Sequence, residues 1–149
     1  MNVAEQHLRP TRPEDRKQVG LLLQEGQLPT DAMTSNAADL WLLEEGGRAV
    51  AVGGFEFYGT DALLRSVAVA RAERGAGFGS RIVDHLLGVA YRRGIKTVWL
   101  LTETARDFFI RKGFVVIERS TITNAELSAS PEFTHVCSTT AVCMKRTLQ

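Results

Sequence analysis

A glycine-rich run between two apolar segments carries the clearest chemical signal in this sequence. Residues 74–79 read Arg-Gly-Ala-Gly-Phe-Gly. Because glycine lacks a Cβ atom, Gly75, Gly77 and Gly79 allow positive φ angles and a close approach of the backbone to a ligand. A helix is expected to follow, and its first N–H groups lack intrahelical partners and favour anions. We interpret the run as a pyrophosphate-binding loop, to which Arg74 adds a positive charge.

Other glycine loops differ from this one in spacing. A dinucleotide-binding loop reads G-x-G-x-x-G with an acid about 20 residues further on, whereas this run reads G-x-G-x-G. A P-loop requires Gly-Lys-Ser/Thr, but Gly79 is followed by Ser80 and Arg81. A glycine-rich turn with a purely structural role remains the alternative.

The elements that must position this loop follow from the spacing of apolar residues. Residues 62–69 are apolar almost throughout and predict a central strand before the loop, and apolar positions four apart over 78–93 predict an amphipathic helix after it. Val19, Leu21, Leu22 and Leu23 are expected to form the buried face of an earlier helix. Residues 28–38 are interpreted as a loop or a short second helix lying over a site, and residues 121–140 are expected to be irregular. Further strands are expected at 8–9, 40–44, 48–58, 97–101, 114–117 and 141–145, and further helices at 13–25 and 105–112.

Composition limits the classes of partner. The 149 residues suit one α/β domain over 1–149, and 18 basic against 17 acidic side chains leave a net charge of +1. This balance predicts no general attraction to nucleic acid or to a membrane. Cys137 and Cys143 are expected to be reduced thiols, and with His135 as the one other soft ligand nearby no metal is expected. No apolar stretch reaches the length of a membrane span, so a cytoplasmic location is expected.

The order of these elements, together with three local motifs, resembles the GNAT family of acyl-CoA N-acyltransferases. The family's phosphate-binding motif, Q/R-x-x-G-x-G/A, is matched by Arg74, Gly77 and Gly79. Its preceding strand resembles residues 64–69, and its A-x-x-F-F-x-x-x-G-F pattern is matched over residues 105–114. The resemblance extends from residue 8 to residue 145.

This resemblance implies an α/β fold (α+β in some schemes), with a splayed, mostly antiparallel mixed sheet of six or seven strands and about four helices. It implies acetyl-CoA as cosubstrate. The pantetheine would lie where the strand ending at Val69 parts from the strand ending at Leu101, bonding to the backbone like an added strand. The residues implied to contact acetyl-CoA are Val67, Ala68, Val69, Arg74, Gly75, Ala76, Gly77, Phe78, Gly79, Ser80, Phe108 and Phe109.

Members of the family usually transfer the acetyl group by direct attack of the acceptor amine. This mechanism requires a base that accepts the ammonium proton of the acceptor. It also requires a backbone N–H that stabilises the oxyanion, and we expect this group near Val67. Glu56 is the first candidate for the base, because alternation places it on the sheet face opposite Phe55 and Phe57. Glu103, just past a strand, is the second. Each could instead be a structural or solvated acid.

Arg65 is the main candidate on the acceptor side. A guanidinium within an apolar strand is costly to bury unless it is paired, and it can bind a carboxylate through two parallel hydrogen bonds. It could therefore bind the carboxylate of an amino-acid-like acceptor, or it could pair with Glu56 or another acid on a neighbouring strand. Ser66, Thr102 and Thr104 could add hydrogen bonds.

One position departs from the family pattern. Many members carry a tyrosine where this chain has Phe109, so water, Tyr58 or no residue would protonate the leaving thiolate. Within the family, residues 63–69, residues 100–105 and the tail Ser130-Pro131-Glu132-Phe133 to Cys137 resemble the small N-acetyltransferases found with arsenic-resistance genes, which are related to the acetylglutamate-synthase-type domains. We therefore expect acetylation of a small amino-acid-like amine; the alternatives are a protein lysine or N-terminal acetyltransferase and a catalytically weak acyl-CoA sensor. A homodimer is a further expectation of the resemblance.

Overall fold

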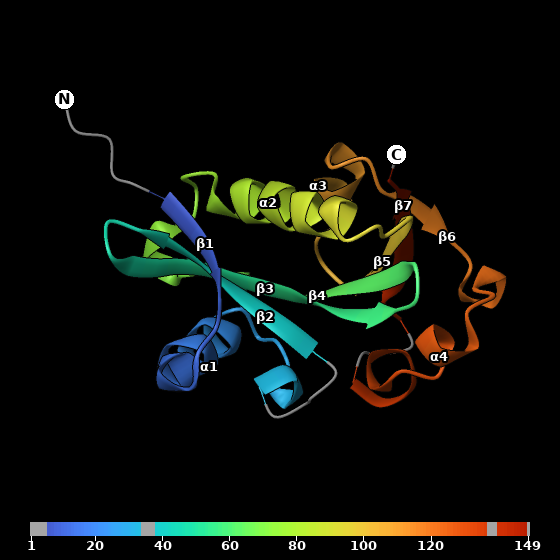
Figure 1. The fold of residues 1–149 in the computed structure, drawn as a ribbon, viewed down its shortest axis with the longest axis horizontal. Coiled ribbons are helices and arrows are strands. Elements are labelled where there is room, and N and C mark those ends of the chain that lie inside the picture. Colours follow the sequence, from blue (N-terminus) through green and yellow to red (C-terminus); the bar gives the residue numbers. More distant parts are fainter. Residues whose placement is uncertain (1–5, 34–37, 137–139, 149) are drawn as a thin grey trace. The chain divides into compact units, whose positions relative to one another are not determined.

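The computed structural model describes residues 6–33, 38–136 and 140–148. The chain forms two compact units. The first unit comprises Met1–Glu56 and Ser66–Gly88, and the second comprises Phe57–Arg65 and Val89–Gln149. Strands β3 (Arg48–Tyr58) and β4 (Asp61–Val69) and helix α2 (Phe78–Arg92) contribute residues to both units (Figure 1).

Within the described residues, seven strands are hydrogen-bonded in the order β1-β2-β3-β4-β5-β7-β6. The pairs β1–β2, β2–β3, β5–β7 and β6–β7 are antiparallel, and β4–β5 is parallel. This confirms the expected mixed, mostly antiparallel sheet. The strands not yet given are β1 (Gln6–Pro10), β2 (Ala38–Glu45), β5 (Thr97–Thr102), β6 (Val115–Ile117) and β7 (Val142–Thr147).

The parallel pair of strands separates after a short contact. β4 pairs with β5 from Asp61↔Thr97 to Leu63↔Trp99, and the described register ends there. All six residues of β5 pair with β7 instead. Leu64 and Arg65 therefore continue β4 beyond its ladder with β5, which is the separation that a splayed sheet requires.

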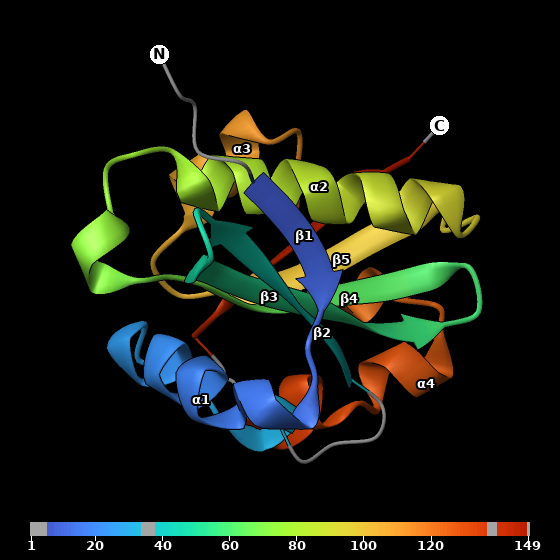
Figure 2. The ribbon, with the colours of Figure 1, turned by 60° about the vertical axis from the view of Figure 1, so that its left-hand side comes forward.

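The first unit packs helices on both faces of its strands. Helix α1 (Arg16–Glu25), preceded by a 3-10 turn at Pro13–Asp15, packs on β2 and β3 through a cluster of buried aliphatic side chains. An added Cβ at Gly53 would contact Leu86 of α2, so the start of α2 lies on the opposite face (Figures 1 and 2). Leu21, expected in the buried face, is 47% exposed because it points away from the i, i+3, i+4 stripe. The cluster comprises Val19, Leu22, Leu23, Leu40, Leu42, Val52 and Ala68.

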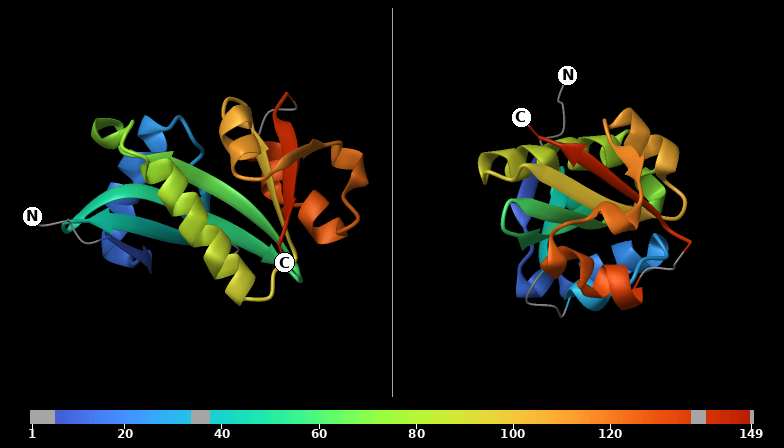
Figure 3. Two further views of the ribbon diagram at one scale, coloured as in Figure 1. Left: turned by 90° about the horizontal axis from the view of Figure 1, so that it is seen from above. Right: turned by 90° about the vertical axis from the view of Figure 1, so that its right-hand side faces the viewer.

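The second unit contains β5, β7 and β6 side by side, with α3 (Arg106–Arg111) and α4 (Ala125–Ser128) (Figure 3). Leu63, Trp99, Leu127 and Cys143 form its buried core cluster. Gly94 and Gly113, which follow the ends of α2 and α3, have φ angles of 82° and 87°, the left-handed backbone that commonly ends a helix.

The prediction of an irregular segment over 121–140 was wrong in part, because it contains α4 and a π-helical turn at Glu132–Val136. Asn124 is the residue that organises the start of this segment. Its Oδ1 accepts the N–H of Leu127 at 3.1 Å, which caps α4. Its Nδ2 donates to Asp61 Oδ2 at 2.9 Å. A single amide therefore connects α4 to the first residue of β4.

Candidate active site

The glycine loop leaves β4 through a 3-10 turn at Arg71–Glu73 and leads directly into α2. Gly75 and Gly77 have φ angles of 88° and 84°, and no described heavy atom lies within 4 Å of an added Cβ at either position. Both positions therefore combine the left-handed backbone that favours glycine with open space beside it. The expectation of a positive φ was wrong for Gly79, because that residue already belongs to the first turn of α2.

Contacts with α1 position the loop. Arg74 donates a hydrogen bond from its guanidinium to the backbone oxygen of Glu25 at 2.9 Å, and the N–H of Arg71 donates to Glu25 Oε2 at 3.2 Å. At the other end, the N–H of Arg81 donates to the oxygen of Gly77 at 3.1 Å, so α2 begins at Phe78. The first N–H groups of α2 have no acceptor within their own helix, and they follow the two glycines with positive φ. This arrangement suits a phosphate group.

Ser66 interrupts β4 between its two halves. Its φ angle is 61° and it is buried, an uncommon combination for a residue other than glycine, asparagine or aspartate. Such outliers concentrate at ligand sites, where the surrounding structure compensates for a cost of order 1–3 kcal/mol. After it, Ala68 is buried while Val67 and Val69 are partly exposed. Ser66 therefore marks the point at which the backbone of β4 changes conformation, directly before the residues predicted to bond to pantetheine.

Glu56 is 1% exposed near the end of β3. It pairs with Ala38 of β2, and directly opposed residues of an antiparallel pair place their side chains on the same face. Leu40 and Leu42 share that face, because they alternate with Ala38 along β2 and pack against α1. Glu56 therefore lies on the α1 face of the first unit, opposite the face of Phe55, as alternation predicted.

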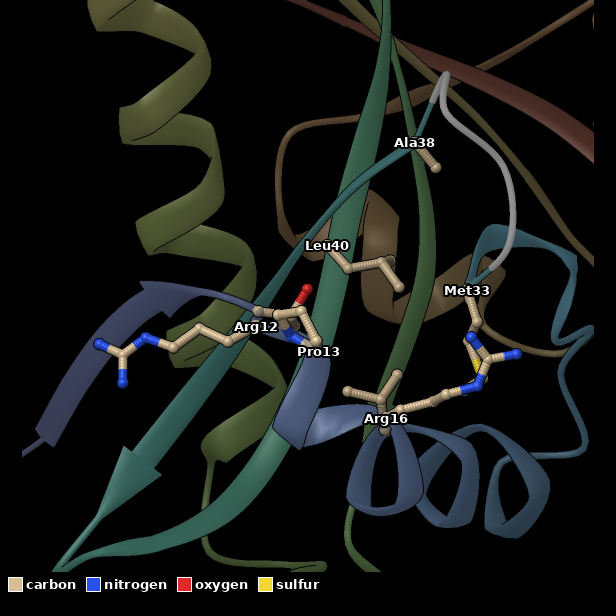
Figure 4. A pocket seen from close by; sticks show the side chains of 8 residues that line it. Arg12, Pro13, Arg16, Met33, Ala38 and Leu40 are labelled. Atoms are coloured by element: carbon tan, nitrogen blue, oxygen red, sulfur yellow. The ribbon is translucent and has the colours of Figure 1, made fainter.

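A pocket of about 340 Å³ opens on this same face of the first unit (Figure 4). Ala38, which pairs with Glu56, forms part of its lining. The pocket thus combines apolar side chains with two arginines, beside the buried acid that was the first candidate for the base. Its lining residues are Thr11, Arg12, Pro13, Arg16, Val19, Met33, Ala38 and Leu40.

Arg65 forms a buried ion pair in the second unit. Its Nε lies 3.6 Å from Oε1 of Glu132, and the two side chains are 1% and 7% exposed. Sequence reasoning expected an acid on a neighbouring strand, whereas this acid comes from the π-helical turn near the C-terminus. Glu132 is the residue that sequence analysis missed. No periodicity marked it, and the one available signal was its place in the tail motif Ser-Pro-Glu-Phe.

The remaining candidates lie at the end of β5 and just after it. Thr102 Oγ1 accepts the N–H of Ala105, the residue before α3, at 3.0 Å, which is a local turn contact. Glu103 is exposed and accepts a hydrogen bond from Thr140 at 3.4 Å, and Thr104 is exposed. This surface setting favours the structural interpretation of Glu103 over a role as base.

Phe109 belongs to the core of the second unit. Its ring makes edge-to-face contacts with Phe108, with centroids 5.0 Å apart, and with Phe114, at 5.5 Å. Phe109 is buried, whereas Phe108 is partly exposed. The position at which relatives carry a tyrosine is therefore occupied here by a packing residue, and Phe108 is the better placed of the two to contact a ligand.

Three further features are the thiols, the potential metal ligands and the apolar character of the helices. Burial raises the pKa of the Cys143 thiol to about 11, so this thiol stays protonated at neutral pH; Cys137 lies outside the described residues. No group of three or more histidine, cysteine or acidic side chains suited to a metal occurs in the described part of the chain. The helices described there include none with the length and apolar character of a membrane span.

The family follows from the match between this chain and known domains. Residues 36–116, more than half of the chain, match the acetyltransferase (GNAT) domain. The chain belongs to the GNAT acetyltransferase family. The matched residues include the glycine loop, β4, β5 and α3.

Relatives indicate where in this family the chain lies. An amino-acid acetyltransferase of Mycobacterium tuberculosis is 38% identical over 90 residues, which are 57% of this chain and 51% of that protein. The chain thus spans about half the length of this curated relative. An M. tuberculosis protein solved with CoA has a TM-score of 0.77 at 26% identity over 96% of this chain and 99% of its own.

A more distant relative shares the fold alone. N-acetylglutamate synthase from Neisseria gonorrhoeae, solved with CoA and N-acetyl-glutamate, has a TM-score of 0.83 at 16% identity. The likeness covers 99% of this chain and 36% of that chain. The expected likeness to acetylglutamate-synthase-type domains is thus confirmed at the level of the fold.

Proposed function

We propose that this acetyltransferase transfers an acetyl group from acetyl-CoA to the amine of a small amino-acid-like acceptor, by direct attack within a single domain. The observation that carries the acceptor class is Arg65, a guanidinium buried in the strand that leads to the glycine loop. The relatives that act on or bind amino acids support the same class. A homodimer, a cytoplasmic location and a link to arsenic resistance are proposals that rest on the sequence resemblance.

The donor would bind to the first unit. The pyrophosphate would accept hydrogen bonds from the backbone of the glycine loop and from the first turn of α2. Pantetheine would lie along Val67, Ala68 and Val69, whose backbone follows the unusual residue Ser66. The positive φ of Ser66 would turn the next peptide, so that the N–H of Val67 can stabilise the oxyanion.

The chemical step requires one proton acceptor. The neutral amine nitrogen of the acceptor forms a bond to the thioester carbonyl carbon, and the ammonium proton passes to Glu56 directly or through a water. The tetrahedral intermediate loses the extra N–H proton to solvent and collapses by breaking the C–S bond, which releases CoA thiolate and the neutral N-acetylated product. The thiolate takes its proton from solvent, because Phe109 has none to give.

Arg65 would bind the carboxylate of the acceptor. Its Nε lies 3.6 Å from Oε1 of Glu132, so a buried carboxylate already neutralises the charge of this guanidinium. A guanidinium has five N–H donors, so an acceptor carboxylate would bind to Arg65 beside Glu132 rather than in its place.

The test is a thiol-release assay with acetyl-CoA and a panel of amines: α-amino acids, simple alkylamines, a lysine peptide and a peptide with a free N-terminus. Saturable release of CoA with amino acids is expected. Turnover only with peptides would favour a protein acetyltransferase. Tight CoA binding without turnover on any amine would favour the acyl-CoA sensor.

Glu56→Gln and Glu103→Gln form a matched pair for the base. We expect Glu56→Gln to lower kcat/KM by about 10²-fold or more. The loss should grow at lower pH, where the amine most needs a base. Glu103→Gln should remain close to the wild type, because Glu103 is exposed. The reverse pattern would assign the base to Glu103, and two near-normal variants would assign proton transfer to water.

A further inference from the structure

Ser130, between α4 and the π-helical turn, has a hydroxyl group that the fold does not use. The residue is 3% exposed, and within the described residues its Oγ has no hydrogen-bond partner. Its backbone groups are engaged instead. The N–H donates to the oxygen of Leu127 at 3.0 Å, and the oxygen accepts the N–H groups of Phe133 and Thr134 at 3.1 Å each. Buried polar side chains are nearly always hydrogen-bonded, because an unmade bond leaves the cost of desolvation uncompensated. The unused hydroxyl therefore points to a partner that the described chain does not supply.

The local sequence predicts a role that this hydroxyl does not perform. A serine followed by proline is typical of a helix N-cap, whose side-chain oxygen accepts an N–H two or three residues later. Here the N–H of Phe133 donates to the backbone oxygen of Ser130 and not to its Oγ. The nearby hydroxyl of Ser128 donates to the oxygen of Ala125 at 3.1 Å. That of Thr134 donates to the oxygen of Ser130 at 2.9 Å. Both neighbours make local bonds, whereas a capping role does not account for Ser130.

The exposure pattern places this hydroxyl on the side of the turn that faces Arg65. Ser130 and Glu132 are 3% and 5% exposed, whereas Pro131 between them is exposed. The two buried side chains therefore both turn inward, and two residues of chain separate their Cα atoms by at most about 7 Å. Glu132 meets the guanidinium of Arg65 at 3.6 Å. The Ser130 hydroxyl thus belongs to the same inward-facing side of the turn as the partner of Arg65.

Contacts at both ends hold this segment on β4. Asn124, directly before α4, donates to Asp61, the first residue of β4, at 2.9 Å. Glu132 reaches Arg65, four residues further along the same strand. A segment fixed at both ends gives its side chains defined positions, as a binding site requires. The π-helical turn that follows Ser130 is a rare element, and such turns occur frequently at functional sites.

We propose that Ser130 is a substrate-binding residue, whose hydroxyl donates a hydrogen bond to the acceptor carboxylate at Arg65. The inference rests on the proposed function and adds a second residue to the acceptor site. Because Glu132 already neutralises Arg65, the ion pair by itself attracts a second carboxylate weakly. A hydroxyl adds a donor without adding a charge that the buried site must balance. Its bond to an ionised carboxylate is stronger than a bond between neutral groups, which supplies the selectivity.

Thermal unfolding of Ser130→Ala, without ligands, distinguishes an unused hydroxyl from a structural one. Removing an unused hydroxyl should leave the Tm equal to or above that of the wild type, because a desolvation cost disappears with it. Removing a cap should lower the Tm by roughly 2–4 °C. A decrease in Tm overturns the inference, because the hydroxyl then has a structural partner.

The kinetic test compares the best α-amino acid of the amine panel with its α-carboxamide, which keeps the amine and the side chain but lacks the charge. Ser130→Ala should raise KM for the amino acid about tenfold or more, as expected for losing a hydrogen bond to a charged group, and should change KM for the carboxamide much less. Ser128→Ala is the matched control, because it removes an exposed hydroxyl that is bonded within its own turn. It should keep the wild-type KM for both acceptors. An equal rise for both acceptors in Ser130→Ala, or no rise for the amino acid, overturns the inference.

Binding of N-acetylalanine in the presence of CoA, measured by calorimetry, separates this inference from the proposed function. This ligand carries the carboxylate and no free amine, so its binding does not require turnover. If the enzyme acetylates no amino acid but Ser130→Ala binds N-acetylalanine about tenfold more weakly than the wild type and Ser128→Ala do, the role of Ser130 stands and the proposed reaction fails. If Ser130→Ala acetylates amino acids with the wild-type KM, the reaction stands and the role of Ser130 fails. A wild type that neither acetylates amino acids nor binds N-acetylalanine overturns both.

Discussion

Gly77→Ala separates the ligand-binding role of the glycine loop from its folding role. Gly77 has a φ angle of 84°, and no described heavy atom lies within 4 Å of the added methyl group. The folding cost therefore comes from the left-handed backbone alone, about 1–2 kcal/mol. For a domain of this size that corresponds to a decrease in Tm of roughly 2–8 °C. If the loop binds pyrophosphate, the methyl group also enters the ligand's space, and CoA affinity should fall about tenfold or more, the loss of one charge-assisted hydrogen bond.

Gly47→Ala is the matched control for this variant. Gly47 lies in the β2–β3 hairpin of the same unit, with a φ angle of 81° and equally open surroundings. It should therefore lose similar stability, measured by thermal unfolding, and bind CoA like the wild type, measured by calorimetry well below the Tm. Equal CoA affinities in the two variants would refute the assignment of the loop to pyrophosphate.

Three further predictions concern buried charges and the buried thiol. Arg65→Ala should lower the free energy of unfolding by about 3 kcal/mol or more, because it leaves Glu132 buried without its cation. The double variant Arg65→Ala/Glu132→Gln should recover part of this loss when unfolding is measured in urea, and no recovery would contradict the pairing. The hydrogen bond from Arg9 lowers the pKa of Asp15 to about 2 in the folded protein against an ordinary 3.8, so its contribution to folding stability is present above about pH 4 and is lost as the pH falls toward 2. The wild type should therefore lose more stability between about pH 4 and pH 2 than Asp15→Asn does. Parallel acid unfolding curves of the two proteins would contradict the contact with Arg9. In a Cys137→Ser background, Cys143 should react with a thiol reagent at neutral pH only after unfolding, since burial raises its pKa to about 11; rapid labelling of the folded protein would contradict this.

Much of the fold was predictable because its signals are local. The strand 48–58 and the helix from residue 78 were predicted to within a residue, since apolar periodicity and flanking glycines mark both ends. The predictions failed where packing against the rest of the chain, rather than local sequence, determines the structure. Leu21 was assigned to a buried face by its hydrophobicity, although its angular position on α1 directs it to solvent. α4 depends on the cap from Asn124 and the burial of Leu127, neither of which is visible as a periodic pattern in a helix of four residues.

Some residues of the candidate site were also predictable from local sequence, and others were not. The glycine loop was found from the sequence, because positive φ angles and a helix start are properties of a few consecutive residues. Glu56 was correctly placed on its face by alternation alone. In contrast, the sequence did not predict the acidic partner of Arg65. A buried guanidinium can pair with any acidic side chain that the fold brings next to its strand, wherever that residue lies in the sequence. Glu132 does so from a segment without periodicity.

The sequence by itself determined the segment proposed to bind the donor: the strand, the glycine loop and the helix that follow one another along the chain. Only the tertiary structure decided which residues surround the proposed acceptor site. The pocket with Arg16, its position on the face of Glu56, and the burial of Arg65 against Glu132 all bring together residues that are distant in sequence. Local preferences specify how a short segment bends, whereas the path of the whole chain decides which side chains meet.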